Sequence, residues 1–310
     1  MRREAETSHA VGGARVTDPG CSTRAGDLVD PARATCDVCP RACSMVPGAT
    51  GACRARSNLG GAVVPSGYGR ITSLAMDPVE KKPLACWRPG SLVLSVGGYG
   101  CNLRCAWCQN HGISQVGETG VAWRELPPEA LVELAAQARG EDRRVAGIAH
   151  TYNEPLVCWE YVRDAGRLAH EAGLANVLVT AGCVSEHVVR ELAPLVDAVN
   201  VDLKAFRAET YRALGGDLAC VRNAIRAFAA EPACHVEVTT LVVPGVNDTV
   251  EEIDELAEWL ATVGSDIVLH VTRFFPRWRM LDRGPTPVGR VYDLADVARA
   301  HLPQVFTGNC

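Results

Sequence analysis

Residues 100–110 read GCNLRCAWCQN and place Cys101, Cys105 and Cys108 within eight positions. Structural zinc takes four ligands, and an ordinary 4Fe–4S cubane takes four cysteines, so three thiols are one too few for either. A cubane held by only three thiolates keeps one iron without a protein ligand, and that iron can chelate a small molecule. Two alternatives stay open, namely a zinc knuckle that borrows a distant fourth ligand and three thiols that are simply buried.

Short apolar runs alternate with amphipathic helical patterns from Leu92 onward. The six runs span residues 92–96, 147–150, 176–180, 198–203, 235–243 and 266–271. Strand followed by helix, six times, predicts an α/β fold with a parallel sheet, a (β/α)6 partial barrel rather than a closed eight-stranded one. The unusual residues directly follow these runs, and chemistry in parallel barrels lies at the carboxyl ends of the strands. We therefore expect one site at the mouth of the barrel.

The composition of the chain limits its location and its partners. It has 310 residues, is 47% hydrophobic and carries a net charge of -5, which argues against a nucleic-acid partner. No apolar run reaches the roughly 18 residues of a membrane-spanning helix. The N-terminus lacks the apolar region of a secretory signal. We expect a cytoplasmic protein that binds neither nucleic acid nor membrane.

A second group of cysteines precedes the first. Cys36, Cys39, Cys43 and Cys53 follow the spacing C-x2-C-x3-C-x9-C. A reducing cytosol leaves such thiols free to bind metals. Zinc usually takes two separated pairs, whereas three ligands within eight residues wrap more naturally around a cubane. We expect a second 4Fe–4S cluster here, which would relay electrons or hold the segment together, and zinc is the alternative.

The chain divides into four parts by composition. Residues 1–33 are aperiodic and predict a disordered tail, and residues 34–60 form a cysteine-rich metal-binding module. Residues 61–91 are a proline-bounded connecting segment, and residues 92–310 form the barrel.

The cysteine spacing, with Trp107 just before the last thiol, resembles the radical S-adenosylmethionine (SAM) signature. Further motifs resemble the AmmeMemoRadiSam system radical SAM enzyme, a family related to pyruvate formate-lyase activating enzyme, and they are CDVCPRACSMVPGATGACRARSN, YGRITSLAMDPVEKKPL, GCNLRCAWCQNHGISQ, TYNEP, DLK and RFFP. The resemblance covers residues 36–309. It implies that Cys101, Cys105 and Cys108 ligate a 4Fe–4S cluster whose open iron binds SAM. Reductive cleavage of SAM would then give methionine and a 5′-deoxyadenosyl radical, which abstracts hydrogen from a substrate.

The resemblance also implies contacts to SAM, from Trp107, Asn153, Glu154, Thr180, Gly182, Asp202, Lys204 and His270. Asn153 and Glu154 would hold the amino group of SAM, since a carboxylate suits an ammonium. The residues alone leave other roles open: a helix-start glutamate at Glu154, a structural ion pair between Asp202 and Lys204, and a core histidine at His270.

The resemblance implies an oxidoreductase-type enzyme but does not name its substrate, for which a peptide or protein is one candidate. An enzyme that installs a glycyl radical on a partner protein is the alternative, and a non-catalytic iron–sulfur electron carrier is a third. The implied partners are a flavodoxin-like or ferredoxin-like electron donor and AMMECR-like and Memo-like proteins.

Overall fold

The computed structural model describes residues 33–310, so the predicted tail lies almost entirely outside the described residues. The main sheet has eight strands in the order β14-β13-β12-β11-β10-β9-β7-β6. Seven of them are parallel, namely β7 (Leu92–Gly97), β9 (Val145–His150), β10 (Ala175–Thr180), β11 (Ala198–Asp202), β12 (His235–Val242), β13 (Val268–Arg273) and β14 (Val305–Gly308). The edge strand β6 (Ser73–Pro78) pairs antiparallel to β7. The predicted α/β class and all six predicted strands are confirmed, and β6 and β14 add to them.

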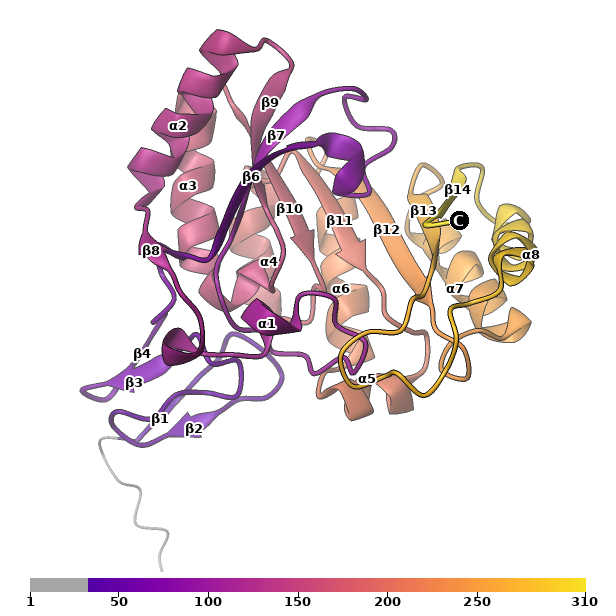
Figure 1. Cartoon of the computed structure of the whole chain (residues 1–310), viewed down its shortest axis with the longest axis horizontal. Helices are drawn as coiled ribbons and strands as arrows, with labels where there is room; N and C mark the ends of the chain where they lie inside the picture. The colour runs from indigo at the N-terminus through magenta and orange to yellow at the C-terminus, as the bar shows by residue number, and fades with distance from the viewer. Residues whose placement is uncertain (1–32) are drawn as a thin grey trace, which may run out of the picture. The chain divides into compact units, whose positions relative to one another are not determined.

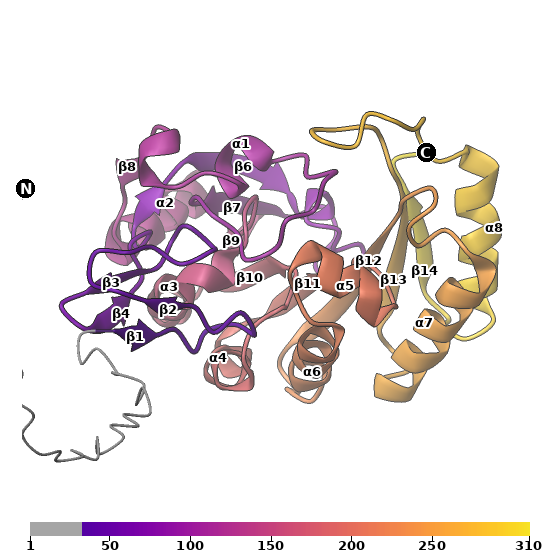
Figure 2. The same cartoon turned by 90° about the horizontal axis from the view of Figure 1, so that it is seen from below.

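A helix follows each of the first six parallel strands. The crossover helices are α2 (Pro128–Glu141), α3 (Trp159–Glu171), α4 (Glu186–Leu192), α6 (Leu218–Ala229), α7 (Val250–Val263) and α8 (Val288–Arg299). In α7, Ile253, Leu256 and Leu260 recur at helical spacing and are fully buried. Figure 2 shows α4, α6 and α7 along one side of the sheet, which leaves the loops at the strand ends to form the site. None of the helices in residues 33–310 has the length and apolar content needed to cross a membrane.

The cysteine-rich segment forms two small antiparallel pairs. These are β1 (Ala34–Thr35) with β2 (Ser44–Met45), and β3 (Ser57–Leu59) with β4 (Ala62–Val64). Figure 1 shows all four strands together at one end of the described chain. The module is anchored to the barrel because both terminal nitrogens of Arg56 donate to the Glu160 carboxylate, at 2.9 and 2.8 Å.

Part of the predicted connecting segment 61–91 belongs to the main sheet, because β6 pairs with β7. Beyond β6, this segment contacts β11, where Asn200 Nδ2 donates to Pro83 O at 2.7 Å. The backbone amides of Ala85 and Cys86 donate to the fully buried Glu237 carboxylate at 2.9 and 2.8 Å. Burial alone would raise the pKa of Glu237, but its hydrogen bonds lower that pKa to about 2, so the carboxylate stays ionised.

Candidate functional site

The loop after β7 carries the three predicted cluster cysteines and is shaped by glycine. Gly100 has φ +83°, and a Cβ at this position would lie 2.3 Å from Cys53 O. The next residue, Cys101, donates its N–H to that same Cys53 oxygen at 3.1 Å. Only glycine therefore allows the loop to approach the cysteine-rich module this closely.

The three thiols of this loop lie within electrostatic reach of one another. Cys101 Sγ accepts from Leu103 N–H at 3.3 Å, and Cys108 Sγ lies 3.2 Å from Ser114 Oγ. Burial raises the pKa of Cys101 well above its ordinary value, and the charges of Glu154 and Cys105 add to this effect. Residues 33–310 contain no three His, Cys, Asp or Glu side chains already arranged to hold a metal ion.

A lysine ammonium lies beside the thiols. Lys204 Nζ pairs with Asp202 Oδ2 at 2.8 Å, as the DLK motif predicts for two opposite charges at one strand end. Burial would lower the pKa of Lys204, but the charges of Asp202 and Cys105 hold it above its usual range. Burial raises the pKa of Cys105 to about 11, and the positive charge of Lys204 opposes that rise. The lysine is therefore charged and can offset the negative charge of thiolates.

Glu154 joins two strand ends. Its Oε1 accepts from Leu156 N–H at 3.1 Å and from Thr180 Oγ1–H at 2.6 Å, and its Oε2 accepts from Ala181 N–H at 2.8 Å. Thr180 Oγ1 in turn accepts from Gly182 N–H at 2.9 Å. Glu154 thus begins the 3₁₀ helix η3 (Pro155–Cys158), the helix-start role left open by the sequence, and also fixes the turn after β10. Three of about four acceptor positions on the carboxylate are filled, which leaves one on Oε2.

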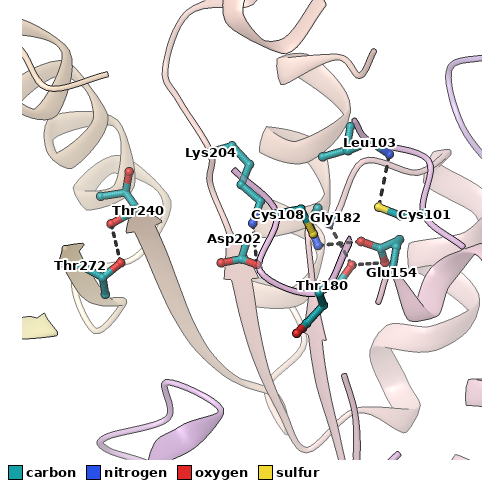
Figure 3. Close-up of polar contacts among 12 residues, drawn as sticks. Cys101, Leu103, Cys108, Glu154, Thr180, Gly182, Asp202, Lys204, Thr240 and Thr272 are labelled. Carbon is teal, nitrogen blue, oxygen red and sulfur yellow. Dashed lines mark hydrogen bonds and ion pairs between the residues drawn. The ribbon is translucent and has the colours of Figure 1, made fainter. Parts of the chain in front are cut away.

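Figure 3 shows how these side chains gather from separate strand ends. The labelled residues that lie together are Cys101, Cys108, Glu154, Thr180, Gly182, Asp202 and Lys204. Thr240 and Thr272, from β12 and β13, lie apart from this group. The structure therefore brings together most of the predicted site residues.

Asn153 and Trp107 have mainly internal partners. Asn153 Oδ1 accepts from Gly98 N–H at 3.1 Å, and Asn153 Nδ2 donates to Gly100 O at 3.1 Å. Asn153 therefore braces the glycine segment that leads into the cysteine loop. Trp107 is buried and belongs to the same core cluster as Cys105 and Leu103.

His270 does not join the group. Its Nε2 lies 2.5 Å from Glu237 Oε2, and its ring stacks on Phe306 with centroids 5.6 Å apart. These contacts favour the core-histidine alternative over a contact with the adenosyl group. The physical reason is that the buried Glu237 carboxylate is surrounded by hydrogen-bonding groups, the backbone amides of Ala85 and Cys86 and the ring of His270 among them.

Comparison with known proteins decides the family. A model of the Radical SAM superfamily matches residues 95–260. This chain belongs to the Radical SAM superfamily. It is 34% identical to the uncharacterized protein MJ0808 of Methanocaldococcus jannaschii, over 91% of this chain and 83% of that protein. It is also 32% identical to a probable GTP 3′,8-cyclase of Archaeoglobus fulgidus, over 51% of each chain.

A solved structure shares the fold of this radical SAM protein. A radical SAM methyltransferase from Sphaerobacter thermophilus superimposes with a TM-score of 0.55 and 20% identity, over 71% of this chain and 66% of that one. Membership in the superfamily implies a 4Fe–4S cluster and SAM. The donor set fits this pair, since one loop offers three thiols and Lys204 supplies a positive charge beside them.

The loop between β13 and α8 reaches the cysteine loop of this radical SAM protein. Arg279 N–H donates to Ala106 O at 2.9 Å, and Trp278 stacks on His111 with ring centroids 5.5 Å apart. Figure 1 shows the loop running from β13 toward the cysteine loop beside α1 (His111–Ser114). The motif RFFP marked where this loop starts, but a loop has no sequence period that could predict its destination.

Several further residues hold the site and were not predicted. Asn102 Nδ2 donates to Cys183 O at 2.7 Å and links the cysteine loop to the turn after β10. Asn247 Nδ2 donates to Lys204 O at 3.0 Å, and Tyr211 Oη accepts from Lys204 N–H at 3.0 Å. Asn247 belongs to PGVND, whose place after a predicted strand was the one available signal.

The four N-terminal cysteines also gather. Cys36 N–H donates to Cys43 O at 2.9 Å across the β1–β2 hairpin, and Ala52 N–H donates to Cys43 Sγ at 3.4 Å. Burial raises the pKa of Cys53 to about 11, and the charges of Cys39, Cys36 and Cys43 contribute to the rise. All four thiols therefore lie within electrostatic reach of one another.

Proposed function

We propose that this chain is a radical SAM enzyme in which Cys101, Cys105 and Cys108 hold a 4Fe–4S cluster with one iron open to SAM. One observation carries the proposal: one loop at the mouth formed by the strand ends carries three thiols, and the half-buried ammonium of Lys204 lies close enough to Cys105 and Cys108 for their charges to interact. When bound, the cluster supplies the electron that cleaves SAM into methionine and a 5′-deoxyadenosyl radical, which takes hydrogen from the substrate.

The chain's own residues contribute charge, orientation and shielding. The Lys204 ammonium offsets the negative charge of the Cys105 and Cys108 thiolates, and Leu103 N–H donates to Cys101 Sγ. The free acceptor position on Glu154 Oε2 suits the ammonium group of SAM. Glu154 also orients the turn at Thr180 and Gly182, which would meet the ribose or carboxylate.

The test is reductive cleavage of SAM by anaerobically reconstituted protein with dithionite as the reductant. Wild-type protein should release 5′-deoxyadenosine, and Cys105→Ala should release no more than buffer alone. Cys310→Ala is the matched control, because Cys310 is exposed and its thiol donates only to Gly308 O at 3.6 Å. Release of 5′-deoxyadenosine by iron-loaded Cys105→Ala protein would contradict the ligand assignment.

We further propose that the enzyme belongs to the AmmeMemoRadiSam system, acts in the cytoplasm and modifies a peptide or protein. The motifs quoted above support this assignment, and AMMECR-like and Memo-like proteins are the expected partners. The test is anaerobic incubation with SAM, reductant and each candidate partner. A mass change in one partner, formed together with 5′-deoxyadenosine, supports the proposal, whereas a glycyl radical signal on the partner supports the activating-enzyme alternative.

A further inference from the structure

The two groups of cysteines touch through the backbone. The hydrogen bond from Cys101 N–H to Cys53 O joins the first ligand of one group to the last cysteine of the other. Arg41, inside the N-terminal group, donates from Nε to Asn102 O at 2.8 Å, one residue beyond Cys101. The N-terminal module therefore rests directly on the cysteine loop rather than at a distance from it.

The hairpin brings the N-terminal cysteines near one another. Cys36 and Cys43 lie just beyond β1 and β2, where Cys36 N–H donates to Cys43 O at 2.9 Å, and Ala42 N–H donates to Cys39 O at 3.1 Å in the connecting turn. The chain then returns so that Ala52, the neighbour of Cys53, donates to Cys43 Sγ. Two of the thiols are buried and two are half-buried, so the group lies between the core and the surface.

The spacing of these thiols fits a cubane better than zinc. Residues 36–43 carry C-x2-C-x3-C, which is the reverse of the C-x3-C-x2-C carried by residues 101–108. Both trios span eight residues, and the N-terminal one gains Cys53 as a fourth ligand. Zinc fingers and ribbons instead take two separated pairs of ligands, and zinc has no redox chemistry to exchange with a neighbouring cluster.

Three arginines lie close to the contact between the two groups. They are Arg41, whose Nε donates to Asn102 O at 2.8 Å, and Arg54 and Arg104, which directly follow Cys53 and Leu103 in the chain. Arg104 is exposed, whereas the chain as a whole carries a net charge of -5. Local positive charge in an acidic chain suits the docking of an acidic partner protein.

We propose that Cys36, Cys39, Cys43 and Cys53 hold a second 4Fe–4S cluster with no open iron, and that it delivers electrons to the cluster on the cysteine loop. The electron source is a low-potential one-electron carrier protein. The carrier is oxidised by one electron and the second cluster is reduced by one, and that electron then crosses the Cys53–Cys101 contact. No bond forms or breaks and no proton moves. The delivery step rests on the proposed function, but the second cluster does not.

The first experiment counts metals in the full chain carrying Cys101→Ala, Cys105→Ala and Cys108→Ala together. The protein is reconstituted with iron and sulfide in the presence of equimolar zinc. About four irons and four sulfides per chain are expected, with an absorption spectrum that SAM does not alter. One zinc with negligible iron overturns the second cluster. If the triple variant does not fold, loaded wild-type protein serves instead, where about eight irons support the proposal and about four irons with one zinc overturn it.

The second experiment separates electron delivery from mere stability, using Cys43→Ala with Cys234→Ala as control. Cys234 is half-buried and belongs to neither group. With dithionite as the reductant, Cys43→Ala protein should still form 5′-deoxyadenosine. With reduced flavodoxin as the donor, it should form none, and electron paramagnetic resonance should show no reduction of the cluster on the cysteine loop. Unchanged reduction by flavodoxin, or equal loss with both reductants, overturns the delivery step. If wild-type protein cleaves no SAM with dithionite, the proposed function fails, while the metal count still decides the second cluster.

Discussion

The cysteine loop and the N-terminal module carry the same type of ligand, cysteine thiols, in different surroundings. Each places three cysteines within eight residues, but the module adds Cys53, whereas the loop has Lys204 and Glu154 nearby instead. Four thiols would complete the coordination of a cubane. Three thiols beside an ammonium and a buried carboxylate leave a ligand position open and supply groups to orient what fills it. On the proposals made above, the surroundings of a cysteine trio, more than the trio itself, would distinguish an electron-transfer site from a catalytic one.

A substitution at Gly100 should break the contact between the cysteine loop and the N-terminal module, and it should have the largest effect on the free energy of unfolding. In Gly100→Ala the new Cβ would meet Cys53 O at 2.3 Å, and the residue would keep a left-handed φ of +83°. We expect a loss of about 4 kcal/mol in the free energy of unfolding, measured by urea titration, with lower iron content at both sites. Gly112→Ala is the control, since its Cβ would meet nothing within 4 Å, and its stability should change by less than about 1 kcal/mol. Equal stability of the two variants would contradict the close contact.

Lys204→Met removes the charge that distinguishes the loop from the module. It leaves the partly exposed Asp202 carboxylate without its partner, which should cost about 2 kcal/mol of unfolding free energy. The cluster on the loop should become harder to reduce, while the signal of the module's cluster stays unchanged in electron paramagnetic resonance. Lys81→Met is the control, because the Lys81 side chain is 68% exposed and its ion pair with Asp77 contributes little. Equal changes in both signals would show that Lys204 does not act locally.

Glu154→Gln tests the buried carboxylate, which lies near the cysteine loop and has no counterpart in the N-terminal module. Glutamine keeps one acceptor oxygen, but its amide nitrogen cannot accept the hydrogen bond that Oε2 now takes from Ala181 N–H, and the negative charge that suits the ammonium of SAM is lost. We expect SAM to bind about 30-fold more weakly, or about 2 kcal/mol, by anaerobic calorimetry, with both cluster spectra intact. Glu186→Gln, on the exposed side of α4, should leave the affinity unchanged. If Glu154→Gln loses stability but binds SAM normally, its role is only that of a helix-start residue.

Arg104→Glu, in the cysteine loop directly before Cys105, should have the smallest effect on stability and tests where the electron donor docks. Arg104 is exposed, so the free energy of unfolding should change by less than about 0.5 kcal/mol. Reduction by flavodoxin should slow at low ionic strength, and the difference from wild type should vanish at high salt, as rapid-mixing absorbance would show. Arg143→Glu, exposed just before β9, provides a charge-reversal control. Equal slowing in both variants would indicate net charge rather than a docking position.

The sequence predicted the features that depend on spacing. Apolar runs bounded by polar residues located all six predicted strands, and the strand-end rule brought Cys101, Thr180 and Lys204 to one mouth. The DLK motif likewise predicted adjacent opposite charges, which the structure shows as an ion pair. These features follow from periodicity and chain connectivity, and both can be read directly from the amino-acid sequence.

Features that depend on which distant backbone groups meet were not predictable. Glu154 accepts a hydrogen bond from Ala181 N–H, and Asn153 accepts one from Gly98 N–H, only because the folded sheet places their strands side by side. His270 was assigned by resemblance, but the donors collected by Glu237 determine where its ring lies. The segment before β7 showed no strand period because its residues serve both an edge strand and the contacts near Glu237.

The most direct test of the difference between the two cysteine groups is a SAM titration of fully loaded, dithionite-reduced protein, followed by electron paramagnetic resonance. The account predicts two 4Fe–4S signals, of which one changes on adding SAM and is missing from the triple alanine variant at Cys101, Cys105 and Cys108. The other signal should be the same with and without SAM. A single signal, or two signals that are both insensitive to SAM, would contradict the account.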